Sequence, residues 1–394
     1  MRFDAQTYRL SEAGKLGTIA LGIGIVGIAG CVGAYFVDPK QFFYSYLTAF
    51  VFWTSIGLGG LFFSMIHHLV DATWSVVVRR IIETIAYSLP ILLIFFIPVA
   101  LGMSNLFQWS DSTQVASDHL LKSKSGYLNT GFFLIRTLVY FAIWTFLAVR
   151  LYRLSRKQDG GHDLSITTTW RKISAPGMIL FALTTTFAAI DWIMSLDAHW
   201  YSTIFGAYYF AGAAMSLMAV TLILVIYLHK NNILRGTVTE EHYHDLSKLM
   251  FAFIVFWAYM AFSQYFLIWY ANIPEETIWF KHRWEGSWKT ITLIIVIGHF
   301  CLPFLMLITR AAKRSANFLL FVTFFMLTIH YIDMYWLIFP NLHHHGPHFS
   351  WVDLTSILAI GGPFIWYFWS KFTSGPIVPV GDPKLPASIK FVNQ

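Results

Sequence analysis

Histidine and carboxylate side chains that could relay a proton lie inside stretches of this sequence that are otherwise apolar. His330 and Asp333 are three positions apart, so they share one face of a helix, and His299 belongs to the preceding apolar stretch. A carboxylate that hydrogen-bonds an imidazole orients the ring and adjusts its proton affinity, as a relay requires. We predict that these three residues belong to a proton path, although each could instead be a hydrogen-bonded packing residue.

A second polar group lies where one apolar stretch ends and the next begins, and its members are His67, His68, Asp71, Arg79, Arg80 and Glu83. Glu83 follows Arg79 by one helical turn, so the two side chains face each other. The pair is either a structural ion pair at the depth of the lipid headgroups or the mouth of a proton path. We predict that the two histidines, Asp71 and Glu83 form the inner entrance of the path.

Arg136 is a cation inside a third apolar stretch, where a charge is costly unless it is paired. Asp191 lies near the same end of the following stretch and is its natural counter-ion. We predict that Arg136 and Asp191 form the outer half of the proton path, together with the two histidines and Asp333 described first.

The sequence contains few candidate ligands for redox cofactors or metals. The two cysteines, Cys31 and Cys301, lie in different stretches, which excludes cysteine-ligated clusters and covalently attached haem c. His299 and His330 are the only plausible pair for haem b, and their spacing is not that of four-helix b cytochromes. The histidines at 343–345 and 348 lie in a surface loop. We therefore predict no bound metal, no cofactor held by this chain and no catalytic residue.

One segment, 262–276, combines an apolar helix with a polar end. Gln264 lies within the apolar part, and Asn272 and Pro274 should stop the helix because proline lacks the N–H that would continue it. Glu275 and Glu276 then place two carboxylates at the membrane surface. This series is the most specific local motif in the chain.

The composition indicates that these residues lie in a membrane protein. The chain is 57% hydrophobic and only 12% charged, whereas about a quarter of the residues in a soluble domain are charged. Windows of about 20 apolar residues, each long enough to cross a bilayer, follow one another. We predict an all-α polytopic membrane protein with ten transmembrane helices, at 16–37, 43–69, 77–102, 129–152, 174–196, 202–228, 248–272, 287–309, 317–339 and 351–372.

The distribution of charge predicts the orientation. The first apolar stretch is too long for a cleavable signal peptide and is interpreted as a retained span. Lys and Arg concentrate in the alternate loops that share the side of the N-terminus, so both termini should be cytoplasmic by the positive-inside rule. The net charge of +7 thus reflects topology, and no nucleic-acid partner is predicted. The opposite loops are rich in Trp, His and acidic residues, as expected where partner proteins bind.

A faint internal repeat suggests how the spans are grouped. Tyr44 and Ser45 open the second span, as Tyr201 and Ser202 open the sixth, and small residues follow at matching offsets. We predict a single membrane domain, 1–394, with a first four-helix bundle at 43–196 and a second at 202–339. The two bundles would be pseudosymmetric, and spans 1 and 10 would be peripheral.

Three segments resemble the F subunit of bacterial alternative complex III, a quinol:cytochrome c oxidoreductase, in the family of membrane subunits related to polysulfide reductase and nitrite reductase. They are AIDWIMSLDAHWYST at 189–203, SQYFLIWYANIPEE at 263–276 and RWEGSW at 283–288. The similarity extends over essentially the whole chain. The first two segments are shared by the C and F subunits, and the chain length and ten spans favour F.

The resemblance implies a subunit of a respiratory complex in the bacterial cytoplasmic membrane. Its partners would be a sister ten-span membrane subunit, a periplasmic iron–sulfur subunit and haem c subunits, with a terminal oxidase as a further candidate and lipid around it. The iron–sulfur clusters and haem c would belong to those partners. This chain would then be a subunit without a redox centre that supports quinol oxidation and provides a transmembrane proton path.

Three alternatives remain open. In the first, the chain binds quinol or quinone itself at the outer end of the first bundle, through Asp191 and Arg136. Family members that bind quinone there use an aspartate and a histidine, and this sequence has no histidine in the outer half of spans 2–4. The second alternative is a structural anchor whose charges only pair with one another. The third is an independent secondary transporter.

Overall fold

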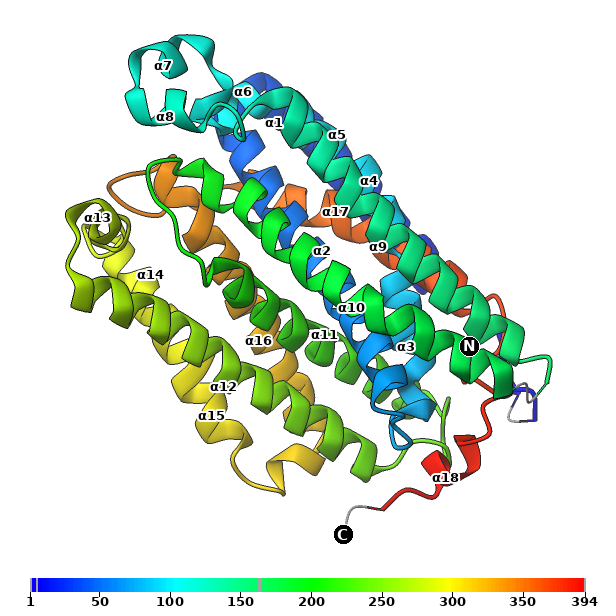
Figure 1. Cartoon of the computed structure of the whole chain (residues 1–394). Helices are drawn as coiled ribbons and strands as arrows, with labels where there is room; N and C mark the ends of the chain where they lie inside the picture. Colours follow the sequence, from blue (N-terminus) through cyan, green and yellow to red (C-terminus); the bar gives the residue numbers. More distant parts are fainter. Residues whose placement is uncertain (1, 5, 162–163, 393–394) are drawn as a thin grey trace.

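The computed structural model, which describes residues 2–4, 6–161 and 164–392, is an all-α polytopic membrane protein. Ten of the described helical segments are long and apolar enough to cross a membrane, as the sequence predicts. They run side by side in one elongated bundle (Figure 1). One end carries both chain termini, and we call it the terminal end. The other, which we call the loop end, carries the short helices α7 (Ser112–Ser117), α8 (His119–Lys124) and α13 (Pro274–His282).

The remaining helices of the first half are α1 (Leu16–Val37), α2 (Pro39–Leu69), α3 (Val76–Tyr87), α4 (Leu89–Phe95), α5 (Ile97–Leu101), α6 (Met103–Leu106), α9 (Thr130–Gln158) and α10 (Leu164–Trp192). Those of the second half are α11 (Phe205–Lys230), α12 (Glu240–Ala271), α14 (Trp288–Ile295), α15 (Leu302–Leu307), α16 (Ala316–Ile338), α17 (Trp351–Phe372) and α18 (Leu385–Ile389). A π-helical segment, Val296–Cys301, joins α14 to α15. Strands β1 (Arg2–Asp4) and β2 (Arg9–Glu12) form an antiparallel hairpin.

Helices α2, α10 and α12 begin earlier than the predicted spans, and polar caps extend two of them, α2 and α12. Helix α2 begins at Pro39, where the side chain of Asp38 accepts a hydrogen bond from the backbone N–H of Gln41 at 3.1 Å. Proline fits the first turn, since that N–H has no partner within the helix. Helix α12 begins at Glu240, where Thr239 and His242 form a reciprocal capping box. Hydropathy alone does not detect such polar first turns.

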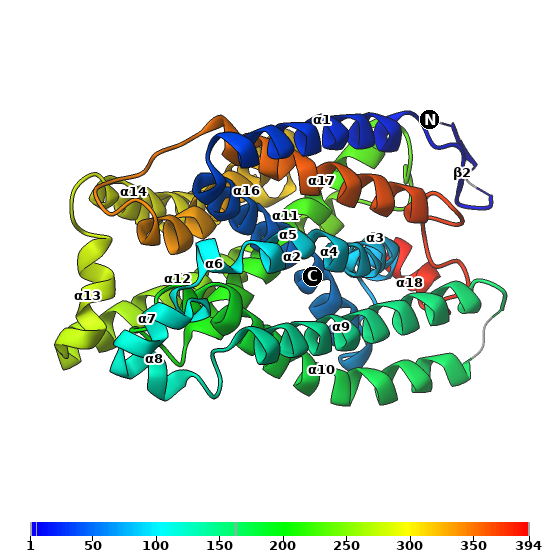
Figure 2. The ribbon, with the colours of Figure 1, turned by 90° about the horizontal axis from the view of Figure 1, so that it is seen from above.

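The helices form two sets of mutual contacts. In the first set, α2 packs against α3 and α10, and α9 packs against α3 and α10. In the second set, α11 packs against α12 and α16. Helix α2 also contacts α11, which joins the two sets, and α1 packs along α17 at one side (Figure 2). These contacts group the helices without testing the bundle boundaries at 43–196 and 202–339 or the pseudosymmetry, which stay predictions.

Small residues allow the closest helix approaches. A Cβ atom on Gly59 of α2 would lie 2.4 Å from the carbonyl oxygen of Ala213 in α11. Likewise, a Cβ atom on Gly362 of α17 would lie 2.4 Å from the Cα of Gly24 in α1. Helices in a membrane associate mainly through such close packing, because lipid tails are as apolar as their side chains. Helix α2 is consequently buried along most of its length.

Candidate functional site

Two helices of the second half bring His299, His330 and Asp333 together. His330 and Asp333 come from one face of α16, and His299 comes from the π-helical segment. All three side chains are completely buried. The His299 Nε2 atom lies 3.9 Å from Asp333 Oδ2, and the ring centroids of the two histidines are 6.3 Å apart. We call these three residues the His–Asp cluster.

The carboxylate of Asp333 is held by two aromatic donors that the sequence reasoning missed. The Tyr208 hydroxyl donates to Oδ1, and Trp257 Nε1 donates to Oδ2 at 3.2 Å. Trp257 also stacks on the His299 ring, with centroids 3.7 Å apart. These donors come from α11 and α12, so nothing in their sequence spacing relates them to Asp333.

The histidines keep unused hydrogen-bonding capacity. His330 Nε2 lies 3.0 Å from the Ser55 hydroxyl of α2. Among the described residues, neither ring nitrogen of His299 nor Nδ1 of His330 has a hydrogen-bond partner. Buried polar atoms are nearly always paired with protein or water. The cluster therefore offers three buried nitrogens at which a proton or a water molecule can be exchanged.

The same residues are also spaced closely enough to be considered as metal ligands. One donor atom from each of the three lies within 4.8 Å of the others, and two imidazoles with a carboxylate are a donor set that transition metals accept. Both carboxylate oxygens of Asp333 already accept hydrogen bonds, from Tyr208 and from Trp257. A metal ion would have to share these oxygens with two donors that already stabilise the carboxylate, so the geometry suits proton exchange better than metal binding.

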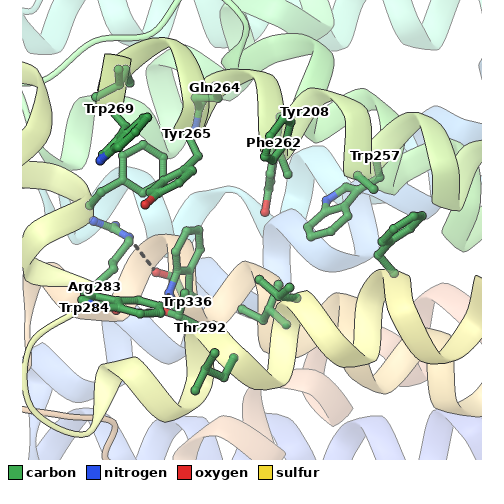
Figure 3. A pocket seen from close by; sticks show the side chains of 18 of the residues that line it. Tyr208, Trp257, Phe262, Gln264, Tyr265, Trp269, Arg283, Trp284, Thr292 and Trp336 are labelled. Carbon is green, nitrogen blue, oxygen red and sulfur yellow. Dashed lines mark hydrogen bonds between the residues drawn. The ribbon is translucent and has the colours of Figure 1, made fainter. Parts of the chain in front are cut away.

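A cavity of about 650 Å³ lies beside the cluster (Figure 3). Its walls come mainly from α12, α13 and α14, and many of its lining side chains are aromatic. It reaches from Lys281 at the loop end to Tyr208 and Trp257, which separate it from Asp333. No carboxylate of the described chain lines it. Its volume is in the range of small-molecule sites, about 300–1,000 Å³.

Arg283 is the most deeply buried cation of this cavity wall. Its guanidinium donates to the carbonyl oxygens of Trp279, Trp336 and Leu337, at 3.0, 3.2 and 2.9 Å (Figure 3 draws the bond to Trp336). Two of these carbonyls belong to the last turn of α16, so Arg283 caps that helix. Burial lowers the pKa of Arg283 to about 9, which leaves it charged at neutral pH.

The predicted inner entrance is a compact network at the terminal end. Arg79 Nε lies 3.0 Å from Glu83 Oε1, and the Ser155 hydroxyl donates to the other Glu83 oxygen at 2.6 Å. His68 Nε2 lies 3.9 Å from Glu83 Oε1, and His67 Nε2 lies 3.4 Å from Arg79 Nη1. The structure thus brings His67, His68 and Glu83 together around Arg79.

Asp71 is placed outside this network. Its carboxylate binds Arg171 at 2.8 Å and Lys384 at 2.6 Å, and its side chain is almost half exposed. The hydrogen bond from Lys384, followed by that from Arg171, lowers the pKa of Asp71 below its ordinary value. Asp71 therefore ties together surface segments, whereas Glu83 is the buried carboxylate of the region.

Arg136 and Asp191 form the predicted ion pair. Arg136 Nε and Nη2 donate to the two oxygens of Asp191 at 2.8 and 3.0 Å, and the Tyr140 hydroxyl adds a third bond at 2.7 Å. The guanidinium also lies against the rings of Tyr127 and Phe132. Both Asp191 oxygens are thus engaged, and neither residue of the pair lines the large cavity.

The motif residues lie near that cavity and at the loop end. Gln264 lines the cavity, and its amide oxygen accepts a hydrogen bond from Ser202 at 2.9 Å. Asn272 ends α12 in the left-handed conformation, with φ at 50°. Glu275 and Glu276 occupy the first turn of α13, where carboxylates interact favourably with the helix dipole.

No protein-family model matches this sequence, and no curated protein is significantly similar to it. The fold and the site therefore define the class of protein. It is a membrane protein with ten apolar helices of spanning length among the described residues, and with a buried His–Asp cluster beside an aromatic cavity.

Proposed function

We propose that this chain is an integral membrane subunit of a respiratory quinol:electron-acceptor oxidoreductase of the alternative complex III type, and that it provides a transmembrane proton path. The observation that carries the proposal is the His–Asp cluster, with its unpartnered buried nitrogens. The resemblance of segments 189–203, 263–276 and 283–288 supports the respiratory assignment. We propose the sister membrane subunit, the periplasmic iron–sulfur subunit and the haem c subunits as its partners, in the bacterial cytoplasmic membrane with both termini cytoplasmic.

Helix α2 provides a route between the two buried polar groups. Ser55 contacts the His–Asp cluster, and His68, thirteen positions later, contacts Glu83. At 1.5 Å per residue this interval spans about 20 Å, roughly two thirds of the hydrocarbon core. Ser64 lies between them on the same helix, and the Thr221 hydroxyl of α11 is buried without a partner in the described chain. Water at these hydroxyls would connect the groups.

The chemistry of quinol oxidation gives such a route a purpose. Oxidation of a quinol releases two protons and two electrons, and the electrons would leave through the partners' iron–sulfur clusters and haems. Asp333 is suited to hold a proton in transit, because Tyr208 and Trp257 stabilise its carboxylate while His299 lies 3.9 Å away. Glu83 would exchange protons at the terminal end.

The test uses the complex purified gently from its own membranes, with haem c and iron–sulfur subunits identified on a gel and in a reduced-minus-oxidised spectrum. We expect Asp333→Asn to lower the number of protons translocated per electron, with assembly and haem content unchanged. Asp118→Asn, which changes a partly exposed carboxylate at the loop end, is the matched control. An unchanged proton yield in the Asp333 variant, or a lone colourless protein on purification, would refute the proposal.

A second candidate function, direct quinol binding, is favoured by the aromatic cavity rather than by Arg136 and Asp191. The cavity has donors in Gln264 and Arg283, and Tyr208 connects it to Asp333. Photo-crosslinking with an azido-quinone distinguishes the sites. Labelled peptides from α12 or α14 would place quinol in the cavity, peptides from α9 or α10 would place it at the ion pair, and labelling confined to a sister subunit would exclude both.

A further inference from the structure

A second pocket, of about 550 Å³, lies at the terminal end and is lined by polar and aromatic side chains. It is formed by β2, α3, the last turns of α9 and the segment that follows α17. The first and last parts of the chain meet here, since the N–H of Ile377 donates to the carbonyl oxygen of Tyr8 at 2.9 Å. We call it the basic pocket because of the charges described next.

Cations outnumber anions in the basic pocket. Arg9, Arg156 and Lys371 line it, with Asp159 as the one carboxylate among its lining residues. Both oxygens of Asp159 accept hydrogen bonds from Arg80, at 2.7 and 2.8 Å. Burial raises the pKa of Asp159, against the influence of Arg80. The carboxylate is therefore already paired with Arg80, and it leaves Arg9 and Lys371 uncompensated.

Two of these cations have no carboxylate within ion-pair distance among the described residues. They are Arg9, which is exposed on β2, and Lys371, whose ammonium lies against the Tyr367 ring at 5.4 Å from its centroid. Arg156 is different, because it donates to the carbonyl oxygens of Lys371 and Pro376, each at 2.9 Å, and lies 4.0 Å from Asp159. Arg156 thus shapes the pocket, while Arg9 and Lys371 supply free positive charge.

The pocket lies at the depth of lipid headgroups. It sits where the membrane-spanning helices α9 and α17 end, at Gln158 and Phe372. Below it, toward the membrane interior, Tyr87 stacks on Tyr152 with centroids 4.3 Å apart, and Tyr367 extends the stack at 6.1 Å from Tyr87. Tyrosines are amphipathic and favour the membrane–water interface. A ligand here would have an anionic end at the cations and an apolar part along the tyrosines.

We propose that the basic pocket binds an anionic phospholipid, with its phosphate between Arg9 and Lys371 and its acyl chains along the tyrosine stack. Basic pockets between transmembrane helices on the cytoplasmic side bind anionic headgroups, and the positive-inside rule assigns this end to that side. The site does not depend on the proposed respiratory function. Occupancy would join the N-terminal hairpin to the end of α17, two segments far apart in the sequence.

The test measures retention of phosphatidylglycerol by the delipidated full-length protein in mild detergent, using native mass spectrometry, with phosphatidylcholine as the neutral reference. We expect Arg9→Gln/Lys371→Gln to weaken phosphatidylglycerol retention by roughly 30-fold, the factor for two cations beside an anionic lipid. Retention of phosphatidylcholine should not change. The matched control is Arg153→Gln/Lys172→Gln, which removes two exposed cations at the same end of the molecule.

Three results would overturn the proposal. They are wild-type retention of phosphatidylglycerol in the pocket variant, an equal loss in the control variant, and a preference for inorganic phosphate that phosphatidylglycerol does not displace. The last result would mean that the cations bind a free anion instead of a lipid. The single variant Arg9→Gln provides a test that does not depend on the folding of the double variant, because the exposed Arg9 side chain is not needed for packing. This single variant should bind phosphatidylglycerol more weakly than wild type while melting at the same temperature in phosphatidylcholine.

Discussion

Arg136 and Asp191 show how a buried charge is neutralised within this protein. The Arg136 guanidinium donates two hydrogen bonds to the Asp191 carboxylate. Its Nη1 donates a third to the carbonyl oxygen of Tyr127, at 2.8 Å. A bidentate pair of this kind is the strongest arrangement open to the two groups. Because the Asp191 carboxylate accepts three hydrogen bonds from within the chain, we interpret the pair as a structural clamp between α9 and α10.

Removing one member of this clamp should be more harmful than removing both. Arg136→Gln leaves the Asp191 carboxylate buried without its cation, so we expect it to destabilise the protein by about 3–5 kcal/mol. Arg136→Met/Asp191→Leu removes both charges and should cost clearly less. Thermal unfolding of the purified protein measures both effects. A single variant that melts like wild type but loses quinol turnover would instead indicate a ligand site at Asp191.

The contacts among the buried polar residues were partly predictable from the sequence at this scale. The spacing of His330 and Asp333 places them on one helix face, and Arg136 has a natural counter-ion in Asp191. Tyr208 and Trp257 were not predictable, because aromatic residues are common throughout these spans and only tertiary packing brings two of them to Asp333. The role of Gly212 was also not predictable. This glycine leaves space for the His330 ring, because a Cβ atom on Gly212 would lie 2.6 Å from that ring.

At the scale of elements, Asp71 joins three segments that are separate in the sequence. It follows α2 and binds Arg171 of α10 and Lys384 of the C-terminal segment. The apolar pattern predicts where α2 ends, but it contains no information on the partner of a polar residue that follows it. The sequence therefore could not show that Asp71, predicted at the inner entrance, lies at the surface with Arg171 and Lys384 and apart from Glu83.

The interactions of Asp71 should contribute to the free energy of unfolding in a way that depends on pH. The pKa of Asp71 is lowered in the folded protein. Its contribution is therefore fully present above the ordinary carboxyl pKa and is lost as the pH falls through the lowered pKa. We expect Asp71→Asn to cost about 0.2–1 kcal/mol at pH 7, as exposed ion pairs do. The difference from wild type should shrink as the pH falls below the ordinary carboxyl pKa, and it should also shrink in high salt.

Asn is a suitable replacement because Asp71 has a positive φ of 53°, which asparagine also tolerates. Melting temperatures of both proteins across this pH range provide the measurement. A difference that persists at low pH would show that the charge of Asp71 is not its source. Asp111→Asn is the comparison variant, because the hydrogen bond from the Thr113 side chain also lowers the pKa of that carboxyl, without an ion pair to a described residue. Its difference from wild type should therefore also fall at low pH, but it should not shrink in high salt.

On the scale of the whole molecule, the two ends differ in chemistry. The terminal end carries the basic pocket and the Arg79–Glu83 network, while the loop end carries the aromatic cavity and the carboxylates of α13. Hydropathy predicted the ten helices, because bilayer thickness leaves little freedom in their length. It predicted neither cavity, since cavities arise from the fit between side chains of different helices.

This asymmetry predicts the orientation in the membrane, which labelling can measure. In a background with Cys31→Ala and Cys301→Ala, a cysteine at Gln114 of α7 should react with a membrane-impermeant maleimide added to intact spheroplasts. A cysteine at Asn231, after α11, should react only once the membrane is opened, because the positive-inside rule predicts that this Lys- and Arg-rich end is cytoplasmic. Both positions are exposed in the structure. The reverse pattern would move Arg9 and Lys371 to the outer leaflet, and it would also turn the predicted entrance at Glu83 into an exit.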